Sequence, residues 1–139
     1  MIVVDAENKI MGRLAAKVAE KAKAGDEVAV VNSEKAVISG DKDRIKADYK
    51  QKKDRGGRHT GPHFPKSPDR ILKRAIKNML PKNRDGRDDV SRVKTYIGVP
   101  EGMEPEELDV KEGTDLQHRN YVKLGDVSRH IGWVPVGER

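Results

Sequence analysis

Apolar positions in the first thirty or so residues follow two different spacings. In residues 2–6 and 27–32 apolar side chains follow one another almost without interruption, whereas between 12 and 24 they recur every three or four positions. The continuous runs predict buried strands, and the wider spacing predicts an amphipathic helix that ends at Gly25. A strand, a helix and a strand in this order predict a right-handed βαβ unit with parallel strands.

The pattern is weaker between residues 36 and 66. Residues 36–40 predict a short third strand, and Asp41 is a suitable N-cap for a mostly exposed helix over 42–53. Glycine and proline recur throughout residues 55–66 and exclude regular structure there.

The clearest helix signal begins at Ser67. This serine is a preferred N-cap, Pro68 suits the first helical position, and Asp69 complements the helix dipole. Pro81 ends the helix. The spacing predicts a buried stripe and an outer basic face, the stripe made of Ile71, Leu72, Ala75, Ile76 and Met79 and the face of Arg70, Lys73, Arg74 and Lys77.

The remaining elements are short. They are a turn at 85–86, one or two helical turns over 87–92, a fourth strand over 93–97, an extended segment over 120–124 and a short helix over 126–131. Residues 101–115 hold seven carboxylates together with glycine and proline, which predicts an acidic surface excursion.

The composition is typical of one small layered α/β domain that spans residues 1–139. Only 35% of the 139 residues are apolar and 37% are charged, so the core is expected to be thin. The absence of cysteine excludes disulfides, zinc–thiolate sites and thiol catalysis. The first apolar run is too short for a signal peptide or a membrane span, so we expect a cytoplasmic protein without a membrane partner.

The positive charge is concentrated in one part of the chain. Residues 42–94 hold eighteen Lys and Arg against seven Asp, a net charge of +11, and the other residues have a net charge of −5. This division favours a basic face for a polyanion at residues 50–87 over a merely solvated surface. The expected contacts are Lys50, Lys52, Lys53, Arg55, Arg58, His59, His63, Lys66, Arg70, Lys73, Arg74, Lys77, Lys82, Arg84 and Arg87.

Catalytic and metal motifs are incomplete. Gly56 and Gly61 have phosphate-loop spacing, but Pro62 and His63 stand where Lys and Ser or Thr are needed. His59 and His63 have a metal-ligand spacing that the intervening glycine and proline remove from any helix. The two histidines either contact nucleic acid or are exposed loop residues, and we expect no metal, cofactor or small-molecule substrate. Few aromatic residues and no zipper pattern leave folded RNA, held by shape and backbone, as the best partner.

Several segments in the same order resemble the large-subunit ribosomal protein thirteen family. They are residues 12–15 (Gly-Arg-Leu-Ala), 30–32, 37–40 and 61–81, and residues 86–87 and 93–100 resemble its archaeal and eukaryotic branch. The resemblance implies a three-layer α/β/α domain around a mostly parallel four-stranded sheet. It also implies a non-catalytic ribosomal constituent that binds large-subunit ribosomal RNA early in assembly, beside other ribosomal proteins. One departure is Lys77-Asn78, where relatives commonly have Arg-Gly.

Two other functions compete with this prediction. One is a small α/β enzyme acting on a phosphorylated or nucleotide substrate, with Ser39, His59 and His63 near the strand ends. The absent phosphate loop and acid–base pair argue against it. The other is a regulator that binds messenger RNA, which charge alone does not distinguish from a ribosomal protein.

Overall fold

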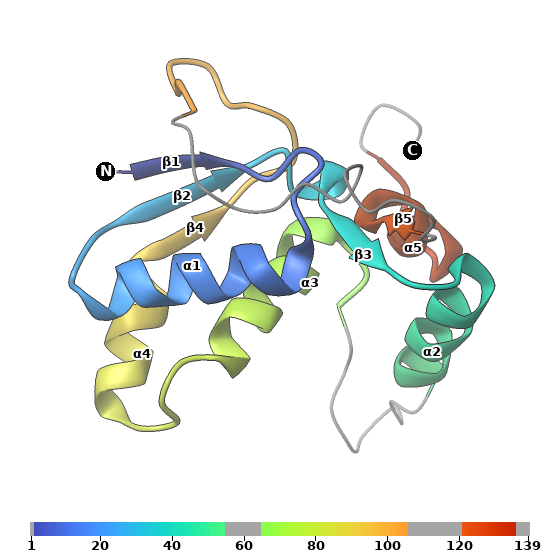
Figure 1. Ribbon diagram of the computed structural model, residues 1–139, viewed down its shortest axis with the longest axis horizontal. Coiled ribbons are helices and arrows are strands. Elements are labelled where there is room, and N and C mark those ends of the chain that lie inside the picture. Colours follow the sequence, from blue (N-terminus) through green and yellow to red (C-terminus); the bar gives the residue numbers. More distant parts are fainter. Residues whose placement is uncertain (1, 55–64, 106–120, 136–139) are drawn as a thin grey trace.

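The computed structural model describes residues 2–54, 65–105 and 121–135 (Figure 1). The expectations for Arg55, Arg58, His59 and His63, and for most of the acidic excursion, lie outside these residues. The predicted βαβ unit is confirmed. Strand β1 (Ile2–Asp5), helix α1 (Met11–Lys23) and strand β2 (Val28–Val31) follow one another, and the two strands are parallel.

The main sheet has three described strands, all parallel, in the order β1-β2-β4. Strand β4 (Val93–Thr95) is the predicted fourth strand in a shorter form. Val30 of the central strand is in register with Val4 on one side and Thr95 on the other. The mixed α/β fold with a mostly parallel main sheet is therefore as expected.

All four residues of β2 are buried, which explains the unbroken apolar run. Val28 and Val30 belong to the core cluster that contains Leu14 of α1, whereas Ala29 and Val31 do not. Alternate residues of a strand point to opposite faces, so the sheet is covered on both sides at its central strand.

The predicted third strand does not pair as a member of the main sheet. Strand β3 (Val37–Ser39), which follows the short 3-10 helix η1 (Ser33–Lys35), pairs antiparallel with β5 (Tyr121–Lys123) in a second sheet. A single parallel bridge joins Val37 to Ile10, and the Val37 N–H donates to the carbonyl of Lys9 at 2.8 Å. The expected four-stranded sheet is thus found only in part, since the pairing partner of β3 lies more than eighty residues away in the sequence.

The helices lie in two groups. Helices α1, α3 (Pro68–Asn78) and α4 (Arg84–Ser91) lie on the lower side of the main sheet in Figure 1, and α2 (Lys42–Asp54) and α5 (Leu124–His130) lie beside the second sheet. The Asp41 side chain caps α2 as predicted, accepting from the Asp43 N–H at 3.0 Å. The predicted turn at residues 85–86 is wrong, because both residues belong to α4, which begins three residues earlier than the helical turns expected from residue 87.

Candidate nucleic-acid interface

Helix α3 is anchored by its apolar side. Ile71, Leu72 and Ile76 are buried in the core cluster together with residues of α1, and Ala75 packs against that cluster. Ser67 occupies the N-cap position with extended backbone, but its side chain makes no capping hydrogen bond. Because three buried side chains fix the rotation of the helix about its axis, the direction of the opposite face is also fixed.

The predicted burial of Met79 is wrong. This residue is the C-cap of α3 and is 41% exposed, whereas Leu80, the next residue, is 3% exposed. The helix ends one residue before Met79, so the helical spacing used for the prediction no longer applies there. Leu80 is instead the residue that packs in the core at this point.

The outer face of α3 is entirely cationic. At 3.6 residues per turn, its four basic side chains fall within about 100° of the helix circumference, and they are Arg70, Lys73, Arg74 and Lys77. Arg70 and Lys77 are exposed, and the other two are half-buried. Like charges three or four residues apart on a helix repel each other, so this face is stabilised when a polyanion lies on it.

Lys94 adds a fifth cation that the sequence did not indicate. Burial of Lys73, and secondarily the positive charge of Lys94, lower the pKa of the Lys73 ammonium. Lys94 is exposed on β4, the strand that packs beside α3. The only signal in the sequence was its polar position inside an apolar strand, which is the ordinary pattern of a solvent-facing residue.

More basic residues continue past the end of α3. Lys82 lies in the connection to α4, and Arg84 and Arg87 lie in the first turn of α4. All three are exposed. The α3–α4 connection forms the lower left edge of the molecule in Figure 1, so these three residues extend the cationic face beyond Lys77.

The α2 lysines lie apart from this face. Lys50 and Lys52 are exposed on a helix that packs on α5 and β5, and the ammonium of Lys52 lies 5.1 Å from the centre of the Tyr49 ring. The side chain of Lys66 lies against Gly132, beyond the end of α5. Lys53 is in α2, and its side chain lies outside the described part of the structure.

One arginine between residues 42 and 94 has a structural role. The Arg92 guanidinium pairs with Asp89, with Nη1 at 2.6 Å from Oδ1, and donates to the carbonyl of Ala22 at 3.3 Å. These contacts tie the end of α4 to the end of α1. The charge of Arg92 is therefore already paired within the protein.

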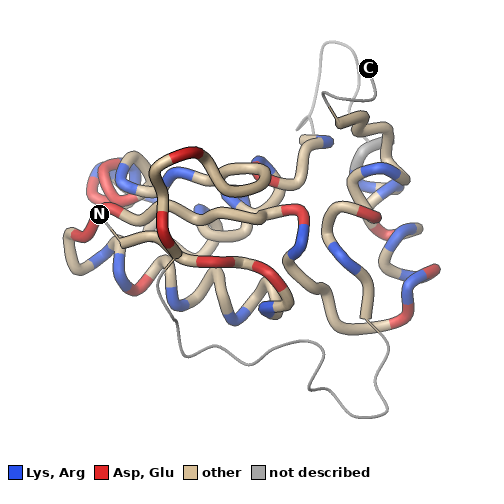
Figure 2. The backbone as a smooth tube through the Cα atoms, turned by 90° about the horizontal axis from the view of Figure 1, so that it is seen from above, with Lys and Arg blue, Asp and Glu red and all other residues tan. Residues whose placement is uncertain are grey.

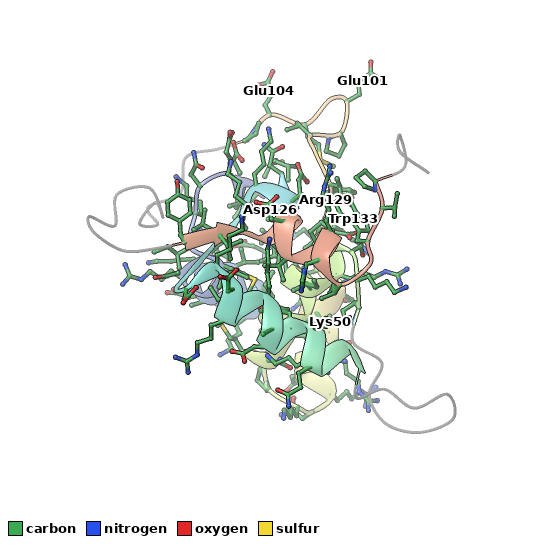
Figure 3. The ribbon with its side chains drawn as sticks, turned by 90° about the vertical axis from the view of Figure 1, so that its right-hand side faces the viewer. Lys50, Glu101, Glu104, Asp126, Arg129 and Trp133 are labelled. Carbon is green, nitrogen blue, oxygen red and sulfur yellow. The ribbon has the colours of Figure 1, made fainter. Side chains whose placement is uncertain are left out.

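An exposed acidic loop lies on the other side of the main sheet from α3 and α4 in Figure 1. Glu101 and Glu104 are exposed on the loop after β4, which extends away from the helices in Figure 3, whereas Lys50 lies among the helices below. Figure 2 views the molecule from above and shows acidic positions along the nearest loop. The Glu34 carboxylate fixes the start of this loop by accepting from the Gly98 N–H, at 3.0 Å from Oε2.

The described residues offer little for catalysis. Ser39 is exposed at the end of β3, and the two histidines expected beside it lie outside the described ranges. Residues 2–54, 65–105 and 121–135 contain no group of three or more side chains suited to a metal ion. No helix in the same ranges combines the length and apolar character of a membrane span.

These features define a small α/β protein with a cationic helical face on one side and an acidic loop on the other. A family described as "Ribosomal protein L13" matches residues 1–102 of the chain. The chain belongs to this family. The predicted resemblance to a ribosomal family, rather than to a family of enzymes, is confirmed.

Archaeal relatives extend the similarity over nearly the whole chain. The large ribosomal subunit protein uL13 of Methanococcoides burtonii is 46% identical over 136 residues, covering 95% of this chain and 98% of the relative. The protein of the same name from Halobacterium salinarum is 47% identical and covers 94% and 90%. That from Archaeoglobus fulgidus is 43% identical and covers 94% and 87%.

Proposed function

We propose that this protein is a structural constituent of the large ribosomal subunit that binds large-subunit ribosomal RNA and supports early subunit assembly. The observation that carries the proposal is the outer face of α3, where four cations share one side of a helix whose other side is fixed in the core. Membership of a ribosomal protein family supports it independently. The corresponding location is the ribosome in the cytoplasm.

The RNA contacts on this surface are mainly to phosphates. Arg70 and Arg74 present planar guanidinium groups that suit paired hydrogen bonds to phosphate oxygens. Lys73 and Lys77 add point charges on the same face. Such contacts position an RNA and supply affinity, but they read little sequence. Recognition therefore depends on the shape of a folded RNA rather than on a series of base contacts.

The other expected RNA contacts fall into two described groups. Lys82, Arg84 and Arg87 extend the α3 face, whereas Lys50, Lys52 and Lys66 lie apart from it, near α5. The proposal also includes Lys53, Arg55, Arg58, His59 and His63, whose side chains or whole residues lie outside the described part. The acidic loop around Glu101 extends away from Lys50 and the helices in Figure 3, and it suits a neighbouring ribosomal protein rather than RNA. In this proposed function the protein is not an enzyme and needs no cofactor.

Salt dependence of RNA binding tests the function. With about six to ten phosphate contacts, the affinity for large-subunit RNA fragments should fall by some 10³-fold or more between about 50 and 200 mM salt, with single strands giving a shallower slope. The variant Arg70→Ala/Arg74→Ala should bind more weakly and keep its helical circular dichroism. The matched control Lys17→Ala/Lys21→Ala removes two cations from α1. Salt-insensitive binding, or an equal loss of affinity in both variants, would refute the proposal.

We also propose that the family's three-layer architecture applies to this chain, with the four-stranded sheet interrupted rather than absent. The support is the bridge between Ile10 and Val37, together with the hydrogen bond from the Asn8 N–H to the carbonyl of Lys35 at 3.0 Å. Both lie where the continuation of β1 passes β3. An experimental structure with bound RNA would decide whether this pairing becomes continuous.

A further inference from the structure

A cleft of about 490 Å³ opens between the end of α3 and the start of α4. Its walls are the last turn of α3, residues 81–83 and the first two turns of α4, at the lower left in Figure 1. This volume lies within the range of roughly 300–1,000 Å³ that is common for small-ligand sites. The cleft is therefore large enough for a ligand group of several atoms.

The backbone around the cleft is held in place without a ligand. Gly86 packs directly against the carbonyl group of Pro81, and its N–H donates to Oδ1 of Asn83 at 3.0 Å. The carbonyl of Asn83 accepts from the Arg87 N–H at 3.2 Å. Since the loop and the helix are joined by these contacts, the cleft is preformed, which lowers the entropy that binding must overcome.

Three kinds of chemical group line the cleft. The ring of Pro81 and the half-buried side chain of Val90 supply apolar surface, and the Asn78 amide supplies both donors and an acceptor. The cations Lys77, Lys82 and Arg87 are exposed at the same cleft and form no ion pair with any residue that the structure describes. Apolar surface, an amide and a cationic rim match a base and its phosphates.

We propose that this cleft takes one unpaired nucleotide of the bound RNA. The base lies against Pro81 and Val90, the Asn78 amide bonds to the base edge, and the flanking phosphates lie at the three cations. A base in a duplex is stacked on both faces and cannot enter a cleft, whereas unpaired bases of loops and bulges can be turned outward. The proposal rests on the proposed RNA binding and adds to it a preference for RNA with an unpaired base.

The position of Lys77 favours RNA over an acidic protein segment as the occupant. This residue belongs both to the cationic face of α3 and to the rim of the cleft, so one RNA strand can contact the two without a break. The carboxylates of an acidic peptide would form ion pairs with the cations, but they would gain nothing from contact with the apolar surface of Pro81 and Val90.

Backbone amide NMR of the full chain distinguishes a cleft contact from a surface contact. The probes are seven-nucleotide single strands of adenylate or uridylate and a blunt-ended RNA duplex of the same length. The single strands should shift the amide signals of Gly86 and Val90. The duplex should shift signals on the outer face of α3, such as Arg70, and leave Gly86 and Val90 unchanged.

Substitutions then test which side chains of the cleft contact the RNA. Asn78→Ala should weaken single-strand binding about 3- to 10-fold, as expected for one lost base-edge hydrogen bond, and leave duplex binding unchanged. Gln51→Ala, an exposed amide on α2, is the matched control and should change neither. Lys82→Ala and Arg87→Ala should each reduce the salt slope of binding by about 1.

Each alternative result overturns the assignment. Equal shifts of Gly86 and Val90 by duplex and single strand, or an Asn78→Ala variant with unaltered single-strand affinity, exclude base insertion. Equal shifts by free adenosine or uridine monophosphate reassign the cleft to a small nucleotide, and equal shifts by a heptaglutamate peptide reassign it to a protein. If RNA still binds through Arg70 and Arg74 but Gly86 does not shift, only the cleft fails. If no RNA binds at all, the proposed function fails with it.

Discussion

Gly86 lies so close to Pro81 that a β-carbon at position 86 would be 1.6 Å from the Pro81 carbonyl oxygen. The atom that would be displaced is backbone, so a side chain cannot be accommodated by rotation of a neighbour. We expect Gly86→Ala to lower the free energy of unfolding by about 1–3 kcal/mol, because overpacking outweighs the better helix propensity of alanine. Urea denaturation of the variant measures this change.

Gly12 is the matched control for this substitution. It also lies in a helix, α1, but a β-carbon there would have no heavy atom within 4 Å apart from its chain neighbours and the backbone of the helix. Gly12→Ala should therefore stabilise the protein by about 0.4–1 kcal/mol. Equal effects of the two substitutions would show that the contact between Gly86 and Pro81 does not constrain the α3–α4 connection.

A second prediction tests which residues anchor α3. Ile76 is 1% exposed and Met79 is 41% exposed. Ile76→Ala should cost about 2–5 kcal/mol of unfolding free energy, whereas Met79→Ala should cost less than about 1 kcal/mol, since little of its surface is buried. Thermal and urea unfolding measure both changes. A large loss of stability in Met79→Ala would mean that Met79 is buried after all, as the helical spacing predicts.

A third prediction concerns Lys73, whose charge is unfavourable to folding and useful for binding RNA. Lys73→Gln removes like-charge pairs with Arg70 and Lys77 on α3, so at pH 7 it should raise the free energy of unfolding by about 0.2–0.5 kcal/mol. The same variant should bind RNA more weakly and with a shallower salt slope. A variant that lost both stability and affinity would contradict this separation.

The pH dependence of that variant follows from the lowered pKa of Lys73. Burial and the charge of Lys94 disfavour the protonated form in the folded chain relative to the unfolded chain, where the pKa is about 10.5. The unfavourable contribution is complete below the lowered pKa and is relieved as the pH rises through it toward 10.5. The stability difference between Lys73→Gln and the parent should therefore shrink between pH 7 and pH 10, as urea denaturation at both values would show.

A fourth prediction separates backbone from side chain at Asn32. This buried residue has a left-handed backbone, with φ of 56°, and its Nδ2 donates to Oδ1 of Asp5 at 3.0 Å. Asn32→Ala loses the hydrogen bond and keeps a β-carbon in a backbone conformation that alanine tolerates less well than asparagine, so it should cost about 2–4 kcal/mol. Asn32→Gly loses the same hydrogen bond but removes the β-carbon from this disfavoured conformation, so it should cost less. Equal losses in urea denaturation would assign the whole effect to the side chain.

Prediction from the sequence succeeded where the signal was local. The cap at Asp41 and the buried stripe from Ile71 to Ile76 depend on residues within one or two turns of each other, and the βαβ unit was predicted from the apolar pattern inside each of its three elements. It failed at Gly86, where a glycine that normally indicates a turn lies inside a helix. The reason is a contact with Pro81 across the α3–α4 connection, which no short pattern contains.

The sequence by itself determined the strand–helix–strand unit, the concentration of positive charge in residues 42–94 and the separation of basic and apolar sides on α3. Each of these follows from the spacing of apolar side chains or from the composition of a segment, and both can be read from the sequence without knowing the fold. Only the tertiary structure decided that β3 pairs with β5, that Lys94 lies beside Lys73 and that α3 and α4 enclose a cleft rimmed by Lys77. These relationships join different helices and strands, so they depend on how the elements pack and not on the spacing within any one of them.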